Sequence, residues 1–265
     1  MRFPKKPADL ALAVIGCLVI GFLLLPVVVV LPMSFNAAPY FEIIPSQPSF
    51  IQYERLFSSA DWFEVLWRSV HVAALATLIA SVVGVLAALG TVRLGARWRS
   101  MAEALLLSPQ IIPSVVIAAS AYYVFATFGL VGSVAGIALM HALLAVPFVV
   151  ILVLSRLESL DPAMVQASAS LGASPVRTFW LVTLPQLKLT LVASSVLAFH
   201  VSFDEVVVAL FLSGARTKTL PVKLWDSILF EVSPLLPAIS TVVVLASVLI
   251  VGSAMWLQRR PDRAE

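Results

Sequence analysis

Residues 10–31 read LALAVIGCLVIGFLLLPVVVVL and contain no Asp, Glu, Lys or Arg. A helix rises 1.5 Å per residue, so about 20 apolar residues cross the roughly 30 Å hydrocarbon core of a bilayer. This run is therefore long enough to span a membrane. It follows a basic N-terminus, as a secretory signal does, but it exceeds the roughly 7–15 residues of a signal's apolar region. We expect it to be an uncleaved first span.

The composition of the whole chain agrees with this interpretation. Of its 265 residues, 61% are hydrophobic and 12% are charged, whereas soluble domains have about 45–50% and about 25%. The mean hydropathy is +1.04. This composition excludes an ordinary soluble enzyme and a disordered chain, and the single Cys17 excludes a disulfide scaffold. The sequence predicts an all-α integral membrane protein.

Six apolar stretches are long enough to cross a bilayer, and we expect them to form a single transmembrane domain over residues 1–265. Pro109 and Pro113 lie in the third stretch and Pro147 lies in the fourth, where they permit bends or form static kinks. The six predicted spans are residues 10–31, 69–92, 104–128, 133–154, 189–213 and 235–257.

Basic residues are distributed unevenly between the predicted loops, and Lys and Arg accumulate in cytoplasmic loops. If both termini are cytoplasmic, twelve of the 17 bases lie inside and five lie outside. The opposite orientation inverts that ratio, so the sequence predicts two cytoplasmic termini. The twelve are Arg2, Lys5, Lys6, Arg93, Arg97, Arg99, Arg156, Arg177, Lys188, Arg259, Arg260 and Arg263; the five are Arg55, Arg68, Arg216, Lys218 and Lys223.

The sequence lacks the motifs of the common enzyme classes. It has no G-x-x-x-x-G-K-[ST] nucleotide loop, no H-E-x-x-H zinc motif and no G-x-S-x-G nucleophile elbow. His71, His141 and His200 lie on three different predicted spans, without the spacing of metal ligands. We therefore expect a transport subunit that is not itself an enzyme and binds no metal.

The insert between the fourth and fifth stretches, residues 155–188, reads SRLESLDPAMVQASASLGASPVRTFWLVTLPQLK. Asp161-Pro162 is typical of a helix start, with Asp161 as the N-cap. We expect Gly172 to end this helix, and Ser174-Pro175 to begin a second one that Pro185 stops. The small residues of such an elbow let another protein approach closely, although the segment could equally be a plain linker between spans.

The spacing within the insert resembles the E-A-A-x3-G-x9-I-x-L-P loop of ABC importer permeases. Gln166-Ala167-Ser168 is followed after three residues by Gly172, and after nine more by Val182-Thr183-Leu184-Pro185. Gln166, Ser168 and Val182 depart from the motif. Further segments resemble the spermidine/putrescine branch of that family. They are Leu197-Ala198-Phe199, Ser202-Phe203-Asp204-Glu205, Thr219-Leu220-Pro221-Val222-Lys223 and Val232-Ser233-Pro234.

This resemblance implies a type I ABC importer permease fold with six spans in a bacterial inner membrane. It implies a homologous second permease, two ATP-binding cassette subunits and a periplasmic solute-binding protein as partners. ATP and Mg would be used by the ATPase subunits, and this chain would bind no cofactor. The insert would dock on an ATPase as a coupling helix, through Met164, Gln166, Ala167, Ser168, Leu171, Gly172, Ala173, Leu184 and Pro185.

Asp204 and Glu205 are ionisable residues inside the fifth apolar stretch. A carboxylate at the bilayer centre costs about 2.5–3.5 kcal/mol on insertion scales, so it should face protein or water. In a continuous helix the two acids would point about 100° apart, and His200 would lie one turn before Asp204. We expect either a cation-attracting element of a translocation path, with Ser202 and Tyr122 beside it, or a structural lock between helices.

Polyamine is the first choice of cargo that the resemblance implies, followed by an amino-acid derivative or an opine-like cation. Two other classes of function remain open from the residues alone. A self-sufficient channel or proton-coupled carrier would use Asp204 or Glu205 as a relay, and a membrane scaffold would need neither.

Overall fold

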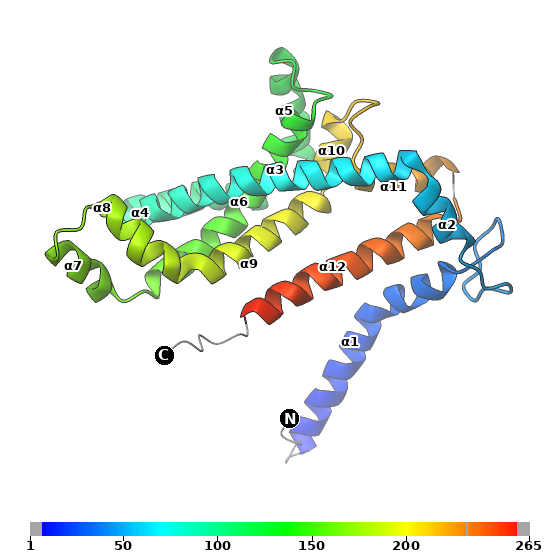
Figure 1. Cartoon of the computed structure of the whole chain (residues 1–265), viewed down its shortest axis with the longest axis horizontal. Coiled ribbons are helices and arrows are strands. Elements are labelled where there is room, and N and C mark those ends of the chain that lie inside the picture. The colour runs from blue at the N-terminus through cyan, green and yellow to red at the C-terminus, as the bar shows by residue number, and fades with distance from the viewer. Residues whose placement is uncertain (1–6, 232, 259–265) are drawn as a thin grey trace. The chain divides into compact units, whose positions relative to one another are not determined.

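A computed structural model of the chain describes residues 7–231 and 233–258, and most of these residues are helical (Figure 1). Six of the bases used to predict the orientation, at the two termini, lie outside the described residues, as does Val232. The elements are α1 (Pro7–Met33), α2 (Ile51–Ser58), α3 (Ala60–Thr91), α4 (Ala96–Leu107), η1 (Ser108–Gln110), α5 (Ser114–Thr127), α6 (Val134–Glu158), α7 (Pro162–Ser170), α8 (Pro175–Thr178), η2 (Phe179–Thr183), α9 (Leu184–Phe203), α10 (Val207–Leu212), α11 (Leu220–Asp226), η3 (Ser227–Glu231) and α12 (Leu236–Gln258).

Each of the six apolar stretches contains helix, but the helices differ in length and continuity. Four helices in the described part of the chain are long and apolar enough to cross a membrane. A fifth is obtained if Ala96–Gln110 and Ser114–Thr127, which are bent by 92°, count as one span. Pro109 and Pro113 flank that bend, and proline removes a backbone donor and blocks the helical ladder. The apolar part of α12, Leu236–Ile250, is shorter.

The prediction that Pro185 stops a short helix was wrong. Pro185 lies in the first turn of α9, and the helix from Pro175 to Phe203 is continuous enough to count as one apolar segment. The five residues of η2 form a π-helical turn, in which the amide of Leu184 donates to the carbonyl of Phe179. Such a widened turn accommodates a residue that interrupts the ordinary ladder.

The chain divides into two compact units, which are described separately. The larger one comprises Glu64–Trp225 together with the end of α12 from Leu249. Its first core cluster joins α3, α6 and α9, and includes Ala80, Val149 and Leu187. The hydroxyls of Ser81 on α3 and Ser195 on α9 lie 3.1 Å apart. A second cluster joins α5, α6 and α10 around Ile137 and Leu212.

Small side chains let α3 approach α6 closely. A Cβ atom added to Gly84 on α3 would lie 2.7 Å from the Cβ of Val149 on α6, which is nearer than real Cβ contacts come. Gly90 lies on the same helix, yet a Cβ there would have nothing within 4 Å. The glycine at 84 is therefore required by the packing, and the one at 90 is not.

Replacing Gly84 by alanine should destabilise the larger unit by about 1–3 kcal/mol, because overpacking forces the two helices apart. The matched variant Gly90→Ala should be neutral or stabilising by up to about 1 kcal/mol, because alanine favours the helix. Thermal unfolding of both variants in detergent, followed by tryptophan fluorescence, measures the difference. Equal melting temperatures would contradict this packing.

The smaller unit contains α1, α2 and most of α12. The span over Leu10–Met33 buries none of its most apolar window against the rest of the chain. A cavity of about 140 Å³ lies between α1 and α12, and its lining is Pro26, Val27, Val30, Leu31, Ser240, Thr241 and Val244. α1 therefore presents nearly all of its apolar surface to its surroundings, as a helix in lipid does.

Candidate functional site

The two helix starts that the sequence predicts in the insert are both capped. The Asp161 carboxylate accepts a hydrogen bond of 2.9 Å from the Ala163 amide and caps α7. Gly172 follows α7 with φ +80°, a left-handed conformation that glycine adopts without a Cβ penalty. Ser174 caps α8 by accepting from the Arg177 amide at 3.3 Å. The hydroxyls of Ser168 and Thr178 lie 2.8 Å apart, so the two helices are tied into one elbow.

The elbow presents apolar side chains to its surroundings. All residues of α7 are described, and none of them is buried. Leu171 is 88% exposed at the turn, and Met164 is 51% exposed. The other predicted contact residues, Gln166, Ala167, Gly172 and Pro185, are exposed as well, while Ser168, Ala173 and Leu184 are partly exposed. Val165, Val176, Trp180 and Leu181 in the same insert are exposed as well.

Arginines fix the base of the insert to the ends of the long helices. Arg156 in the last turn of α6 donates from Nε to the carbonyl of Gln186 in α9 at 3.4 Å. Arg99 on α4 forms ion pairs with Glu103 and with Glu158, the last residue of α6. These bonds connect the base of the insert to α4, α6 and α9.

The fifth stretch differs from the prediction of one continuous helix over residues 189–213. α9 ends at Phe203, Asp204 is its C-cap, and α10 begins at Val207. The Glu205 carboxylate accepts a hydrogen bond of 3.0 Å from the Val208 amide, so it caps the first turn of α10. Side-chain capping of this kind satisfies free amides and competes with helix continuation.

The two acids consequently have different environments. Asp204 is exposed and Glu205 is half-buried. His200 is also exposed, one turn before Asp204 on the same face of α9, and the bond between them joins the Asp204 amide to the His200 carbonyl at 3.0 Å. This is a backbone bond of the helix and not a bond between the two side chains, whereas the Glu205 carboxylate is bonded to the backbone of α10.

Ser202 and Tyr122 make contacts with other residues. Ser202 is buried, and its hydroxyl lies 2.9 Å from Nδ1 of His141, which is buried on α6. Tyr122 lies on α5, is 43% exposed and forms an edge-to-face contact with Tyr123. Within residues 7–231 and 233–258, no group of three or more His, Cys, Asp or Glu side chains could hold a metal ion.

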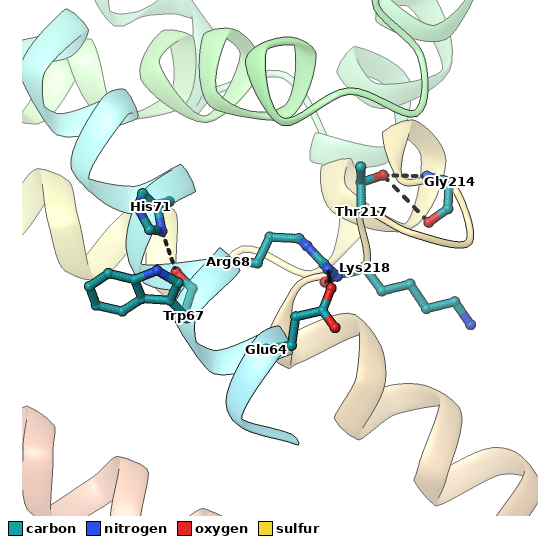
Figure 2. A network of polar contacts seen from close by, with 7 residues as sticks. All are labelled: Glu64, Trp67, Arg68, His71, Gly214, Thr217 and Lys218. Carbon is teal, nitrogen blue, oxygen red and sulfur yellow. Dashed lines mark hydrogen bonds and ion pairs between the residues drawn. The ribbon is translucent and has the colours of Figure 1, made fainter. Parts of the chain in front are cut away.

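A polar network that the sequence analysis did not identify fixes the loop after α10 (Figure 2). Arg68 on α3 forms an ion pair with Glu64 and donates to the carbonyl of Lys218 at 3.1 Å. The Leu220 amide donates to the Ser69 hydroxyl at 2.6 Å, and the Gly214 amide donates to Thr217 Oγ1 at 2.7 Å. In the sequence, only the position of Arg68 beside an apolar run indicates this network. Its partner Lys218 lies 150 positions away, so the contact itself could not be predicted.

Comparison with known proteins identifies the family of this chain. The model of the binding-protein-dependent transport system inner membrane component matches residues 80–264. The spermidine/putrescine permease PotC of Haemophilus influenzae is 28% identical over 91% of this chain and 94% of its own length. The putrescine permease PotI of Escherichia coli is 30% identical over 89% of this chain and 85% of its own.

The fold also has a solved counterpart. A chain of a bacterial alginate ABC transporter, in complex with an alginate pentasaccharide-bound periplasmic protein, superposes with a TM-score of 0.72. It is 17% identical and the match covers 95% of this chain and 94% of that one, a likeness that shows the fold alone. The family match extends over most of the chain, and the helical architecture agrees with it. The chain belongs to the family of inner membrane components of binding-protein-dependent transport systems, the permease subunits of ABC importers.

Proposed function

We propose that this chain is one half of the translocation pore of an ATP-driven importer for a small cationic solute of the polyamine type. The observation that carries the proposal is an exposed apolar elbow, capped and tied at its base, in a chain about 30% identical to putrescine permeases over most of its length. A second, homologous permease completes the pore.

Six spans with both termini in the cytoplasm account for the chain's charge and hydropathy together. Four of the spans are the long apolar helices. The bent pair α4–α5 is the fifth, and the shorter α12 is the sixth. In this orientation the insert and the Arg93–Arg99 turn are cytoplasmic, where most of the bases lie. The first turns of α3, with Glu64–Arg68, and the loop that contains Gly214–Lys218 face outward, where a periplasmic binding protein approaches.

The elbow is the contact with an ATP-binding cassette subunit. Exposed clusters of large apolar residues outside a membrane mark protein interfaces, because water solvates them poorly. Leu171 and Met164 would enter a cleft of that subunit, while Gln166 supplies hydrogen bonds at its edge. Two such subunits bind ATP and Mg, and their closure moves the elbow and, through Arg156 and Arg99, the long helices.

Asp204 is the residue we place on the translocation path. Its exposed carboxylate at the end of α9 suits an ammonium group, with His200 on the same face. Glu205, which caps α10, keeps the backbone open at this point instead. Ser202 supports the path through its bond to His141. Tyr122 lies on a helix that packs against α10, and its ring offers a face to a cation.

The cargo is tested by uptake into proteoliposomes that contain the assembled transporter and its binding protein. Labelled putrescine should be transported only when ATP is present on the side of the membrane where the ATPase subunits lie. Unlabelled spermidine should compete with it for transport. Uncharged diols of the same chain length should not compete. Uptake that depends on ATP but is competed by amino-acid derivatives and not by polyamines would replace the cargo and keep the importer. Uptake without ATP would overturn the importer itself.

A further inference from the structure

A compact loop that exposes apolar side chains follows α1. We call residues 37–47 the apolar loop. Its two ends are hydrogen-bonded to each other directly after the first span. The Ala37 amide donates to the Gln47 carbonyl at 3.3 Å, the Ser49 amide donates to the Phe35 carbonyl at 2.7 Å, and a β-bridge pairs Asn36 with Pro48. The base of the loop is thus fixed three residues beyond Met33, the end of α1.

Side chains hold the loop in one shape. Asn36 donates from Nδ2 to the Tyr40 carbonyl at 2.6 Å and accepts from the Ala38 amide at 3.0 Å. The Glu42 carboxylate accepts from the Ser46 amide at 2.8 Å and from its hydroxyl. These bonds, the amide first, hold the pKa of Glu42 below its usual value. Glu42 is the one charged residue of the sequence between positions 34 and 53, and its carboxylate is bonded back to the loop.

The tip of the loop displays large apolar side chains. Ile44 is 82% exposed, Ile43 is 63% exposed and Tyr40 is 62% exposed, with Phe41 beside them at 41%. Removing an isoleucine side chain from water is favourable by about 1.5–3 kcal/mol. A loop whose backbone is fixed cannot fold these side chains inward, so their exposure calls for an apolar surrounding.

Two observations favour lipid over a protein partner. The loop is continuous with α1, whose own apolar surface is unburied, so the tip lies close to the point where this helix leaves the bilayer. The sequence between positions 7 and 54 contains no Lys or Arg, whereas Arg is enriched in protein interfaces relative to the rest of the surface. Tyrosine and other aromatic residues beside aliphatic ones are typical of the membrane–water interface.

We propose that the apolar loop inserts Ile43 and Ile44 into the membrane–water interface and anchors the outer end of α1 to the lipid surface. The anchor holds the first span at a fixed depth while the rest of the chain moves. This role is independent of the cargo and of the ATPase.

The lone Cys17 makes a spin-label experiment direct. In a Cys17→Ser background, a nitroxide is placed at Ile44→Cys and, in the matched control, at Gln47→Cys, an exposed polar position at the base of the loop. Both are measured in the assembled transporter, in nanodiscs of phosphatidylethanolamine and phosphatidylglycerol. The label at 44 should collide several-fold more with oxygen than with a soluble nickel chelate, and the label at 47 should show the reverse.

Two results would overturn the anchor. Equal access of the nickel chelate to positions 44 and 47 would place the tip in water. Protection of position 44 from both oxygen and nickel would place it against another protein. Ile44→Leu should leave the depth of a second label in α1 unchanged, whereas Ile44→Asp should shift that label toward water; no shift with aspartate contradicts the proposal even if the cysteine variants perturb the loop.

Discussion

Replacing Gly172 by valine should reduce ATP-dependent uptake at least tenfold while the chain still inserts into the membrane. Gly172 has φ +80°, and a Cβ there would meet nothing within 4 Å, so the effect arises from the backbone and not from a clash. A side chain in left-handed backbone costs about 1–2 kcal/mol, and a β-branched one is the least tolerated. The turn then reopens, and Leu171 no longer presents the same surface to the ATPase.

Two control variants separate this mechanism from a general loss of fold. Gly172→Asn should retain most of the uptake, because asparagine tolerates the left-handed region. Gly95→Val should retain most of the uptake, because Gly95 has φ −65° and a Cβ there would meet nothing within 4 Å, although valine is a weaker N-cap of α4 than glycine. The measurements are uptake and solute-stimulated ATPase activity in the same proteoliposomes. If valine at 172 leaves both unchanged, the elbow is a linker and not a coupling element.

The second large effect is expected at Asp204. The isosteric change Asp204→Asn removes the negative charge and keeps the size, and the exposed carboxylate contributes little to folding. A hydrogen bond to a charged group is worth about 1.5–3 kcal/mol, so uptake of a dication at limiting concentration should fall by about 10- to 100-fold. The loss should appear mainly as a raised KM for the cationic cargo.

Glu205→Gln is the matched control for this prediction. Glutamine keeps a side-chain oxygen that accepts from the Val208 amide, so α10 stays capped and uptake should change less than threefold or so, a fraction of a kcal/mol. Were Asp204→Asn silent and Glu205→Gln inactive, the roles of the two acids on the path would be exchanged. Were both silent, neither carboxylate would lie on it.

Much of the local structure is predictable because its signals are local. Apolar runs of about 20 residues set the positions of the long helices, and Asp161, Gly172 and Ser174 mark the elbow where capping chemistry requires them. The bend near Pro113 follows from the missing backbone donor.

The break at Asp204 could not be predicted, because neither proline nor glycine marks it. It depends on the hydrogen bond between the Glu205 carboxylate and an amide of α10. A continuous helix would agree equally well with the hydropathy of the sequence. The pairing of Ser202 with His141 spans 61 positions, and that of Arg68 with Lys218 spans 150. Such contacts follow from helix packing, which periodicity alone does not determine. Pro185 is a second example. Proline usually ends a helix, but here the π turn before it lets the helix continue, and the sequence does not predict that turn.

The most direct test of the account is purification of the tagged chain from its native membrane in mild detergent, with mass spectrometry of the proteins that co-elute. An ATP-binding cassette subunit and a second permease of the same family should be recovered, and a Leu171→Asp variant should lose the ATPase and keep the permease. A chain that elutes alone and moves solute in liposomes without ATP would contradict the importer and favour a self-sufficient channel or carrier.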